Sequence, residues 1–420
     1  MMNFSKISVV GLGYIGLPTA AMFASRGIEV VGVDVNPDVV ATINSGGIHI
    51  IEPDLDAVVY KSVNEGKLRA ILTPEASQAF LIAVPTPISH DTLEPNLDYI
   101  EAAANSIAPV IEKGNLVVLE STVPVGTTEK LCQWLSLKRS DLTFPDTHGE
   151  ASDIRIAHCP ERVLPGKVMQ ELIENDRLIG GISERCAILA KELYTVFVRG
   201  ECVITSSPRT AELAKLTENS FRDVNIAFAN ELSVICDELN VNVWELISLA
   251  NRHPRVNILQ PGAGVGGHCI AVDPWFIVAS SPKTSNLIRT ARNVNDGKPK
   301  WVLQKFREAV QSCLATEKAS ETEEITVAIY GLSFKPDIDD LRESPALAIA
   351  ETIHSEHSGP ILIYEPNLSS LPSTLSNAKL VSADTNNRAN ISLMLVDHSA
   401  FRNLPKPAGH LIDTKGIWKQ

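Results

Sequence analysis

The first two hundred residues alternate between short apolar runs and longer segments in which apolar residues recur at helical spacing. The run Ile7–Val10 is followed by a glycine-rich turn, the helix-forming segment Ala20–Ala24 and the apolar run Glu29–Val33. Such alternation predicts a parallel, doubly wound sheet with helices on both faces. Later strands of this sheet are predicted at Ala79–Val84, Leu116–Leu119 and Arg177–Gly180.

The middle of the chain changes to helical periodicity with few glycines or prolines. One helical stretch runs from Thr210 to about Arg255, and Asn286–Val310 has the pattern of another long helix. These segments predict an all-helical central part. A helical block between two α/β domains is also the expected surface of a homodimer.

After the charged stretch Glu317–Glu324, apolar runs return and predict a second α/β domain. Its strands are expected at Ile325–Tyr330, which is followed by Gly331, and at Ile361–Tyr364 and Leu393–Val396. The predicted fold is therefore α/β, with two doubly wound Rossmann-like domains joined by a central all-helical segment. The expected domains are 1–205, 206–312 and 313–420.

Composition and charge narrow the classes of function. With 44% hydrophobic residues among 420, each domain can bury an ordinary core. The net charge of −13 argues against a general binder of nucleic acid or anionic membranes, because both are polyanions. The seven cysteines include no CxxC pair, so neither a disulfide framework nor a metal is expected. The first residues lack a signal-peptide pattern and no apolar run reaches roughly 18 residues, which predicts a cytoplasmic protein.

The turn after the first predicted strand has the spacing of a dinucleotide site. Gly11 permits a tight turn, Gly13 lets the backbone approach a pyrophosphate, and Gly16 allows close helix–strand packing. The amino end of the next helix offers N–H groups to phosphate. Asp34 follows at a distance where a carboxylate binds the ribose hydroxyls and repels the 2′-phosphate of NADP. Glycines at these positions could be required for packing alone. The combination of a preceding strand, the glycine turn and Asp34 favours a binding site for NAD.

Two threonines follow strands that should lie near this turn. Thr86 comes after Ala79–Val84, and Thr127 comes after Leu116–Leu119. Ligands of open α/β sheets bind beyond the carboxyl ends of the strands. Both loops are therefore expected to border the cofactor, with ordinary turn chemistry as an equally good alternative.

The segment Gly262–Gly267 contains four glycines, and His268 and Cys269 follow it directly. Glycines let the backbone wrap closely around a ligand. A cysteine among apolar residues is usually a small core residue. The glycine loop and Asp273, four residues later, instead favour a nucleophile. His268 is assigned no role, because a hydrogen bond to backbone accounts for it.

On the predicted central helix, Lys215, Asn219 and Arg222 lie at positions i, i+4 and i+7, which share one face. A solvated charged face would have the same pattern. An amide between two cations, however, also suits an oxyanion or a diphosphate.

Six motifs, in order along essentially the whole chain, resemble the UDP-sugar 6-dehydrogenase family, also described as the UDP-glucose/GDP-mannose dehydrogenases. They are Gly11–Gly16, Ser121–Pro124, Pro160-Glu161, Glu212 with Lys215 and Glu218-Asn219, Gly266–Cys269 with Asp273-Pro274, and Phe334–Pro336 with Asp340, Arg342 and Glu343–Pro345.

The resemblance implies an oxidation of the C6 alcohol of a UDP-sugar to a carboxylate with two NAD⁺. In the family mechanism, the cysteine at the position of Cys269 attacks the aldehyde formed first. The resulting thiohemiacetal is oxidised to a thioester, which is then hydrolysed. The resemblance assigns oxyanion stabilisation to Lys215 and Asn219, and water and proton handling to Asp273, Glu161 and Thr122.

The resemblance also implies the binding residues. At the cofactor it adds Tyr14, Ile15 and Arg342 to the residues above. The substrate residues that it implies are Glu161, Arg162, Val163, Lys215, Asn219, Arg222, His253, Arg255, Gly266, Phe334, Lys335 and Lys415.

One departure from the family pattern bears on the substrate. Glucose-type members have a second glutamate four residues after the first, where this chain has Pro165. The segment therefore resembles the branch that acts on UDP-N-acetylhexosamines. The expected substrate is UDP-N-acetyl-D-mannosamine, with UDP-N-acetylglucosamine and UDP-glucose as alternatives. The resemblance also implies a role in bacterial surface polysaccharide synthesis, such as that of enterobacterial common antigen.

Two other classes remain as alternatives. A β-hydroxyacid dehydrogenase shares the first domain and a helical middle, but needs neither Cys269 nor a third domain. A non-catalytic NAD or redox sensor has no need for Lys215, Asn219 and Asp273 together. The number of NADH molecules formed per UDP-sugar separates the three classes. A UDP-sugar 6-dehydrogenase forms two, a β-hydroxyacid dehydrogenase forms one, and a sensor forms none.

Overall fold

The computed structural model describes residues 4–89, 91–164, 166–267, 269–315, 324–382 and 388–418. Pro165 and His268, both singled out by the sequence, lie outside these ranges, as does most of the predicted connection Glu317–Glu324. The chain forms two compact units. One comprises Met1–Glu218 with Trp275–Pro282, and the other comprises Asn219–Pro274 with Lys283–Gln420.

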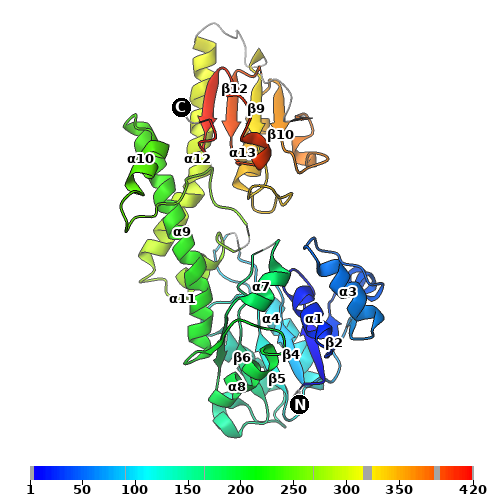
Figure 1. The fold of residues 1–420 in the computed structure, drawn as a ribbon. Coiled ribbons are helices and arrows are strands. Elements are labelled where there is room, and N and C mark those ends of the chain that lie inside the picture. Colours follow the sequence, from blue (N-terminus) through cyan, green and yellow to red (C-terminus); the bar gives the residue numbers. More distant parts are fainter. Residues whose placement is uncertain are drawn as a thin grey trace. The chain divides into compact units, whose positions relative to one another are not determined.

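The first unit contains a single large sheet, drawn from blue to green in Figure 1. Its strands, in spatial order, are β3 (Leu68–Ile71), β2 (Glu29–Val33), β1 (Lys6–Val10), β4 (Ala79–Ile82), β5 (Leu116–Leu119), β6 (Arg155–His158), β7 (Arg177–Gly181) and β8 (Cys202–Ile204). The chain leaves β1 in one direction for β2 and β3, and then returns past β1 to β4. Beyond the reversal point between β1 and β4, such sheets bind nucleotides.

Helices cover both faces of this sheet, as the alternation predicted. They are α1 (Gly16–Ser25), α2 (Pro37–Asn44), α3 (Leu55–Asn64), α4 (Asp98–Ile107), α5 (Thr127–Lys138), α6 (Pro145–His148), α7 (Val168–Glu174) and α8 (Glu184–Tyr194). Val9 of β1 faces a core shared with α1, α3, α7 and α8. Val10, the next residue, faces a second core shared with α4 and α5. Neighbouring strand residues point to opposite faces, so these strands are apolar throughout.

The sheet differs from the prediction at β7. β6 and β7 are antiparallel, with Ala157 opposite Gly181 and His158 opposite Gly180. All the other strand pairs of this sheet are parallel. The first residue of β7, Arg177, therefore lies beyond the carboxyl end of β6. β8 is parallel to β7, so both strands run against the rest of the sheet. Mixed sheets are common among large α/β sheets, and the apolar pattern of a buried strand does not reveal its direction.

The central helices are α9 (Pro208–Glu238), α10 (Val243–Ala250), α11 (Asp273–Ser280) and α12 (Asn286–Ala315). α10 starts at the N-cap Asn242, whose side chain accepts hydrogen bonds from the N–H groups of Trp244 and Glu245. The predicted helices are thus present, although the stretch predicted from Thr210 to about Arg255 is divided between α9 and α10.

In the second unit, α12 and α13 (Pro345–Glu356) pack together beside a parallel sheet (Figure 1). Phe306 of α12 and Ile349 of α13 share an apolar core with the strands. The opposite face holds Tyr330, stacked on Tyr364 with ring centroids 4.4 Å apart. The strands, in spatial order, are β11 (Lys379–Val381), β10 (Ile361–Tyr364), β9 (Val327–Tyr330), β12 (Ile391–Met394) and β13 (His410–Asp413).

Candidate active site

The turn after β1 leaves no room for side chains at two of its three glycines. Gly11 has φ +90°, and a Cβ there would lie 2.7 Å from the carbonyl oxygen of Ala83. A Cβ at Gly16, the first residue of α1, would lie 1.8 Å from the carbonyl oxygen of Gly11. Gly13 is different, because a Cβ there would meet no atom within 4 Å. The turn thus packs closely on one side and is open at Gly13, as a backbone that approaches a ligand requires.

Asp34 lies at the end of β2 and connects two backbone segments. One carboxylate oxygen accepts a hydrogen bond from the N–H of Leu12 at 3.0 Å, and the other accepts one from the N–H of Asn36 at 2.9 Å. The side chain is half-buried, and each oxygen keeps a second lone pair. Tyr14 is exposed and Ile15 is half-buried in the same turn. This arrangement fits a ribose whose hydroxyls donate to Asp34.

The loops after β4 and β5 adjoin the same edge of the sheet. The Ser121 hydroxyl donates to the carbonyl oxygen of Val84 at 2.7 Å, which joins the two loops. The Thr86 hydroxyl oxygen is buried and has no hydrogen-bond partner in the described part of the chain. Thr127 begins α5, and its hydroxyl donates to the carbonyl oxygen of Pro124 at 2.7 Å. Their places beyond strand ends agree with the expectation, and Thr86 retains unused hydrogen-bonding capacity.

Glu212 has a structural role that the sequence did not reveal. It lies on α9, is 1% exposed, and accepts hydrogen bonds from the N–H groups of Gly126 and Thr128 at 2.6 and 2.8 Å. Burial raises the pKa of its carboxyl, while these hydrogen bonds lower it. A carboxylate at a helix start stabilises that helix. Glu212 therefore ties α9 to the amino end of α5, next to Thr127.

Glu161 follows β6 and lies at the carboxyl edge of the first sheet. Arg177 Nη1 lies 2.8 Å from Glu161 Oε2, and these side chains are 2% and 6% exposed. The N–H of Arg162 donates to the other Glu161 oxygen at 2.6 Å. The Arg162 guanidinium in turn pairs with Glu218 of α9 at 2.6 Å. Val163 is half-buried against the core, and Thr122 is half-buried after β5.

The groups around this ion pair are mostly neutral. Burial raises the pKa of Glu120 to about 7, and its carboxylate accepts a hydrogen bond from the Tyr194 hydroxyl at 2.6 Å. Burial also lowers the pKa of His158 to about 3 and raises the pKa of the Cys159 thiol to about 12. Sequence reasoning assigned Arg177, Glu120 and Tyr194 no role. The sequence feature that could have indicated a role for Arg177 is its place as the first residue of a buried strand.

In the second unit, three predicted catalytic residues come together. The Asn219 amide donates a hydrogen bond to Asp273 Oδ2. The N–H of Asp273 donates to the Cys269 carbonyl oxygen at 2.8 Å, so Asp273 starts α11 one turn after the cysteine. Cys269 is exposed and Asp273 is 3% exposed. Lys215, half-buried on α9, lies one turn before Asn219 on the same helix, but belongs to the first unit.

The glycine segment before Cys269 packs against the third predicted domain. A Cβ at Gly266 would lie 2.4 Å from the carbonyl oxygen of Glu343 and 3.0 Å from Phe334 Cβ. Gly267 has φ +83°, and a Cβ there would lie 3.0 Å from the Phe334 ring. Glycine is required at both positions by this close approach. The contact brings Gly266 and Phe334, two predicted substrate residues, together.

Lys415 joins the same region. A Cβ at Gly262 would lie 3.4 Å from Lys415 Nζ, which pairs with Asp397 at 3.1 Å. The N–H of Gly262 donates to the Asn230 side chain of α9 at 2.9 Å, a buried tie that the sequence did not indicate. Lys335 is half-buried beside Phe334 in sequence.

The remaining predicted binding residues lie on the surface. Arg222 is exposed on α9, and His253 and Arg255 are exposed in the loop after α10. The Arg342 guanidinium donates to both carboxylate oxygens of Asp340, two residues earlier, at 2.6 to 3.1 Å. The cofactor role of Arg342 stays a prediction.

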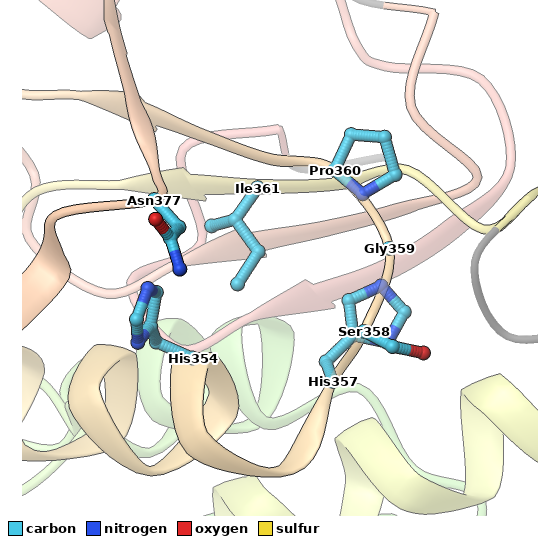
Figure 2. Close-up of a pocket in the computed structure, with 7 residues that line it drawn as sticks. All are labelled: His354, His357, Ser358, Gly359, Pro360, Ile361 and Asn377. Carbon is cyan, nitrogen blue, oxygen red and sulfur yellow. The ribbon is translucent and has the colours of Figure 1, made fainter.

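A surface cavity in the second unit has none of these residues in its wall. Figure 2 shows His354, His357 and Asn377 among the residues that line it. Its volume is about 460 Å³. The cavity also adjoins Ile361, the first residue of β10, and so lies at the amino end of that strand. Because ligands of such sheets bind at the carboxyl ends, we assign the cavity no part in the active site.

No helix among the described residues is long and apolar enough to cross a membrane. Within the same residues, no group of three or more His, Cys, Asp and Glu side chains is arranged to hold a metal ion.

Comparison with known proteins gives a consistent result along the chain. Three family models match: the UDP-glucose/GDP-mannose dehydrogenase family NAD binding domain at residues 5–198, central domain at 209–297 and UDP binding domain at 328–420. A UDP-N-acetyl-D-mannosamine dehydrogenase of Yersinia pestis is 59% identical, with 100% of each chain covered. An NDP-N-acetyl-D-galactosaminuronic acid dehydrogenase of Ralstonia nicotianae is 58% identical, with 99% of this chain and 97% of the relative covered.

A solved structure shows the same similarity in three dimensions. The UDP-D-ManNAc dehydrogenase from Pyrococcus horikoshii has a TM-score of 0.85 and 38% identity, with 99% of this chain and 96% of that chain covered. The first family model spans the whole nucleotide turn and Asp34, so the cofactor is NAD, as the sequence predicted. These matches, which cover all three parts of the chain, show that it belongs to the UDP-glucose/GDP-mannose dehydrogenase family.

Proposed function

We propose that this protein oxidises the C6 alcohol of UDP-N-acetyl-D-mannosamine to a carboxylate, with Cys269 as the nucleophile. The observation that carries the proposal is the connection of Asn219, Asp273 and Cys269 in one unit. An exposed cysteine one helical turn before an acid that is hydrogen-bonded to an amide fits covalent catalysis at an aldehyde.

The reaction proceeds in three steps. NAD⁺ supplies the hydride acceptor for both oxidations. First the C6 hydroxyl loses a proton and C6 loses a hydride, which leaves an aldehyde. The Cys269 thiol then adds to the aldehyde, with sulfur bonding to C6 and the thiol proton passing to the aldehyde oxygen. The resulting thiohemiacetal loses its hydroxyl proton and a second hydride from C6, which leaves a thioester. Finally water adds to the thioester, the C–S bond breaks, and the thiolate and the carboxylate are released.

The other residues act on charge, protons and water. Lys215 and Asn219, one turn apart on α9, stabilise the negative oxygen at C6 in each tetrahedral state. Asp273 and Glu161 accept protons from the hydroxyl and from water, and Thr122 positions that water. The hydrogen bond from Asn219 to Asp273 orients both side chains for these roles.

We assign residues to the UDP-sugar on each unit by itself. On the second unit we assign Phe334, Lys335, Gly266, Lys415, Arg222, His253 and Arg255 to it. On the first unit we assign Glu161, Arg162, Val163 and Lys215. Arginine forks suit the diphosphate because they donate two parallel hydrogen bonds. Arg342 is proposed to reach the cofactor.

Two observations support an N-acetylhexosamine as the sugar. Pro165 stands where glucose-type enzymes have a second glutamate. The names of both relatives at 58–59% identity specify N-acetylated sugars, mannosamine and galactosaminuronic acid. The product is then a nucleotide-linked uronate, the form from which a surface polysaccharide is built.

The test measures kcat/KM for UDP-N-acetylmannosamine, UDP-N-acetylglucosamine, UDP-N-acetylgalactosamine and UDP-glucose in one buffer, with NADH counted per sugar consumed. We expect two NADH and a preference for the mannosamine. An active site that hydrogen-bonds the acetamido group can reject glucose by roughly 10⁴-fold, because its polar groups are left unpaired. One NADH per sugar would refute the thioester route, and equal rates with UDP-glucose would refute the substrate assignment.

We further propose that two copies associate through α9. Its outer face carries exposed apolar side chains at a seven-residue spacing, Phe221 at 70%, Phe228 at 53% and Ile235 at 41%. A stripe with this repeat is the pattern by which helices pair. A patch of this kind pairs with its own copy about a twofold axis.

A further inference from the structure

The pairing of Arg177 with Glu161 follows from the direction of β7. Because β7 runs antiparallel to β6, its first residue lies where β6 ends and where Glu161 follows. A parallel β7 would place its first residue at the opposite edge of the sheet. The antiparallel strand thus brings a buried cation to a loop that carries a proposed catalytic acid.

Arg177 is itself held from the other side by aromatic rings. Its guanidinium carbon lies 5.1 Å from the centre of the Tyr194 ring and 5.8 Å from that of Phe197. Phe197 packs edge-on against Phe23 at 4.7 Å, and the Tyr194 hydroxyl is bonded to Glu120. Cation–π contacts and buried rings leave the guanidinium little freedom to turn. Its position relative to Glu161 is therefore built into the core.

Both oxygens of Glu161 are engaged, one by Arg177 and the other by the N–H of Arg162. The ion contact at 2.8 Å does not have the angle of a linear hydrogen bond, so charge rather than donor alignment dominates it. Apart from Arg177, the titratable side chains that interact with Glu161 include Glu120 and Cys159, and Arg162 follows it directly in the chain. The one other cation among these is the Arg162 guanidinium, which is paired with Glu218 at 2.6 Å.

We propose that Arg177 is the positioning residue of Glu161, holding its carboxylate in one orientation for the handling of water and protons. The inference rests on the proposed role of Glu161. A buried ion pair adds little net stability compared with apolar residues of the same size. The ion pair instead fixes the orientation of the Glu161 carboxylate. A catalytic acid displaced by about 1 Å lowers the reaction rate about 10- to 100-fold.

A kinetic cycle tests whether Arg177 acts through Glu161. The variants are Arg177→Met, Glu161→Gln and the double variant, with kcat and KM for NAD measured for each. We expect Arg177→Met to lower kcat about 10- to 100-fold with little change in the KM for NAD. In the Glu161→Gln background, the same change should lower kcat by less than twofold, because the group that it positions is already disabled.

Two more variants separate positioning from folding. Arg177→Lys keeps the charge and should recover part of kcat. Arg155→Met removes a buried arginine at the amino end of β6, 7% exposed and bonded to Ser152, and should leave kcat near wild type in the folded fraction. If Arg177→Met lowers kcat equally in both backgrounds, its role is structural and the inference is wrong.

The remaining outcomes distinguish the inference from its premise. If Glu161→Gln turns over like wild type, the role of Glu161 is wrong and the inference falls with it, although UDP-sugar oxidation stands. If the wild type oxidises no UDP-sugar, the proposed function itself fails. Denaturant unfolding of the same proteins measures the interaction free energy between Arg177 and Glu161 without any turnover. An interaction free energy of zero would also overturn the inference.

Discussion

Cys269 differs from the other six cysteines in its exposure. They are all buried, and burial raises the pKa of Cys132, Cys159, Cys202 and Cys236. A thiol with a raised pKa is a poor nucleophile at neutral pH, because the thiolate is the reactive form. Cys269 lies instead at the surface, at the end of a glycine segment and one turn before Asp273. Of the seven cysteines, it has the surroundings that the proposed chemistry needs.

We predict that Cys269→Ser will lower turnover by at least about 10²-fold while UDP-sugar and NAD still bind, since a hydroxyl is a weak nucleophile at its ordinary pKa. Steady-state NADH formation and calorimetric binding measure the two effects. Cys186→Ser is the matched control, because that sulfur already accepts a hydrogen bond from the N–H of Ile156 and a hydroxyl can replace it. Uronate production by Cys269→Ser at the wild-type rate would contradict the covalent mechanism.

At the scale of elements, hydrogen bonds connect the ends of β1 and β2 at the predicted cofactor site. Gly11 donates its N–H to the carbonyl oxygen of Val33 at 2.8 Å, and Asp34 accepts the N–H of Leu12. The carboxylate that is predicted to bind the ribose therefore also holds the glycine turn. A change at Asp34 should act on the ligand and on the turn together.

Asp34→Ala is predicted to weaken NAD binding by about 1.5–3 kcal/mol, the value of a hydrogen bond to a charged group. It should also relax discrimination against NADP, whose 2′-phosphate Asp34 would repel. Titration of both cofactors measures the two effects. Asp38→Ala, at an exposed acid in the first turn of α2, should change neither affinity. Unaltered NAD affinity and selectivity in Asp34→Ala would reject the assignment.

At the scale of the whole molecule, the apolar stripe on α9 is the feature that a single chain does not explain. Phe228→Glu places a charge at its centre and should shift the protein from dimer to monomer in sedimentation velocity. A charge buried without a partner in an interface is costly, which is why we expect dissociation. Leu137→Glu, on an 80% exposed residue of α5, should leave the dimer intact. A monomeric wild type, or a dimeric Phe228→Glu variant, would exclude this face as the interface.

The sequence by itself determined the features that depend on local order. The strand–glycine–helix start, Asp34, the helical centre and the glycine segment before Cys269 are all periodic or contiguous patterns, and NAD and the family followed from them. Five short strands were missed because none contains four consecutive apolar residues, unlike the predicted Leu116–Leu119 and Ile361–Tyr364. They are Leu68–Ile71, Arg155–His158, Cys202–Ile204, Lys379–Val381 and His410–Asp413.

Only the tertiary structure decided which distant residues meet. The direction of β7, and hence the pairing of Arg177 with Glu161, depends on strand pairing between segments far apart in sequence. The hydrogen bond from Asn219 to Asp273 and the contact of Gly266 with Phe334 likewise join separate motifs. Periodicity shows which side of an element is buried, but not what is buried against it. Partners and charge environments therefore arise only when the elements pack.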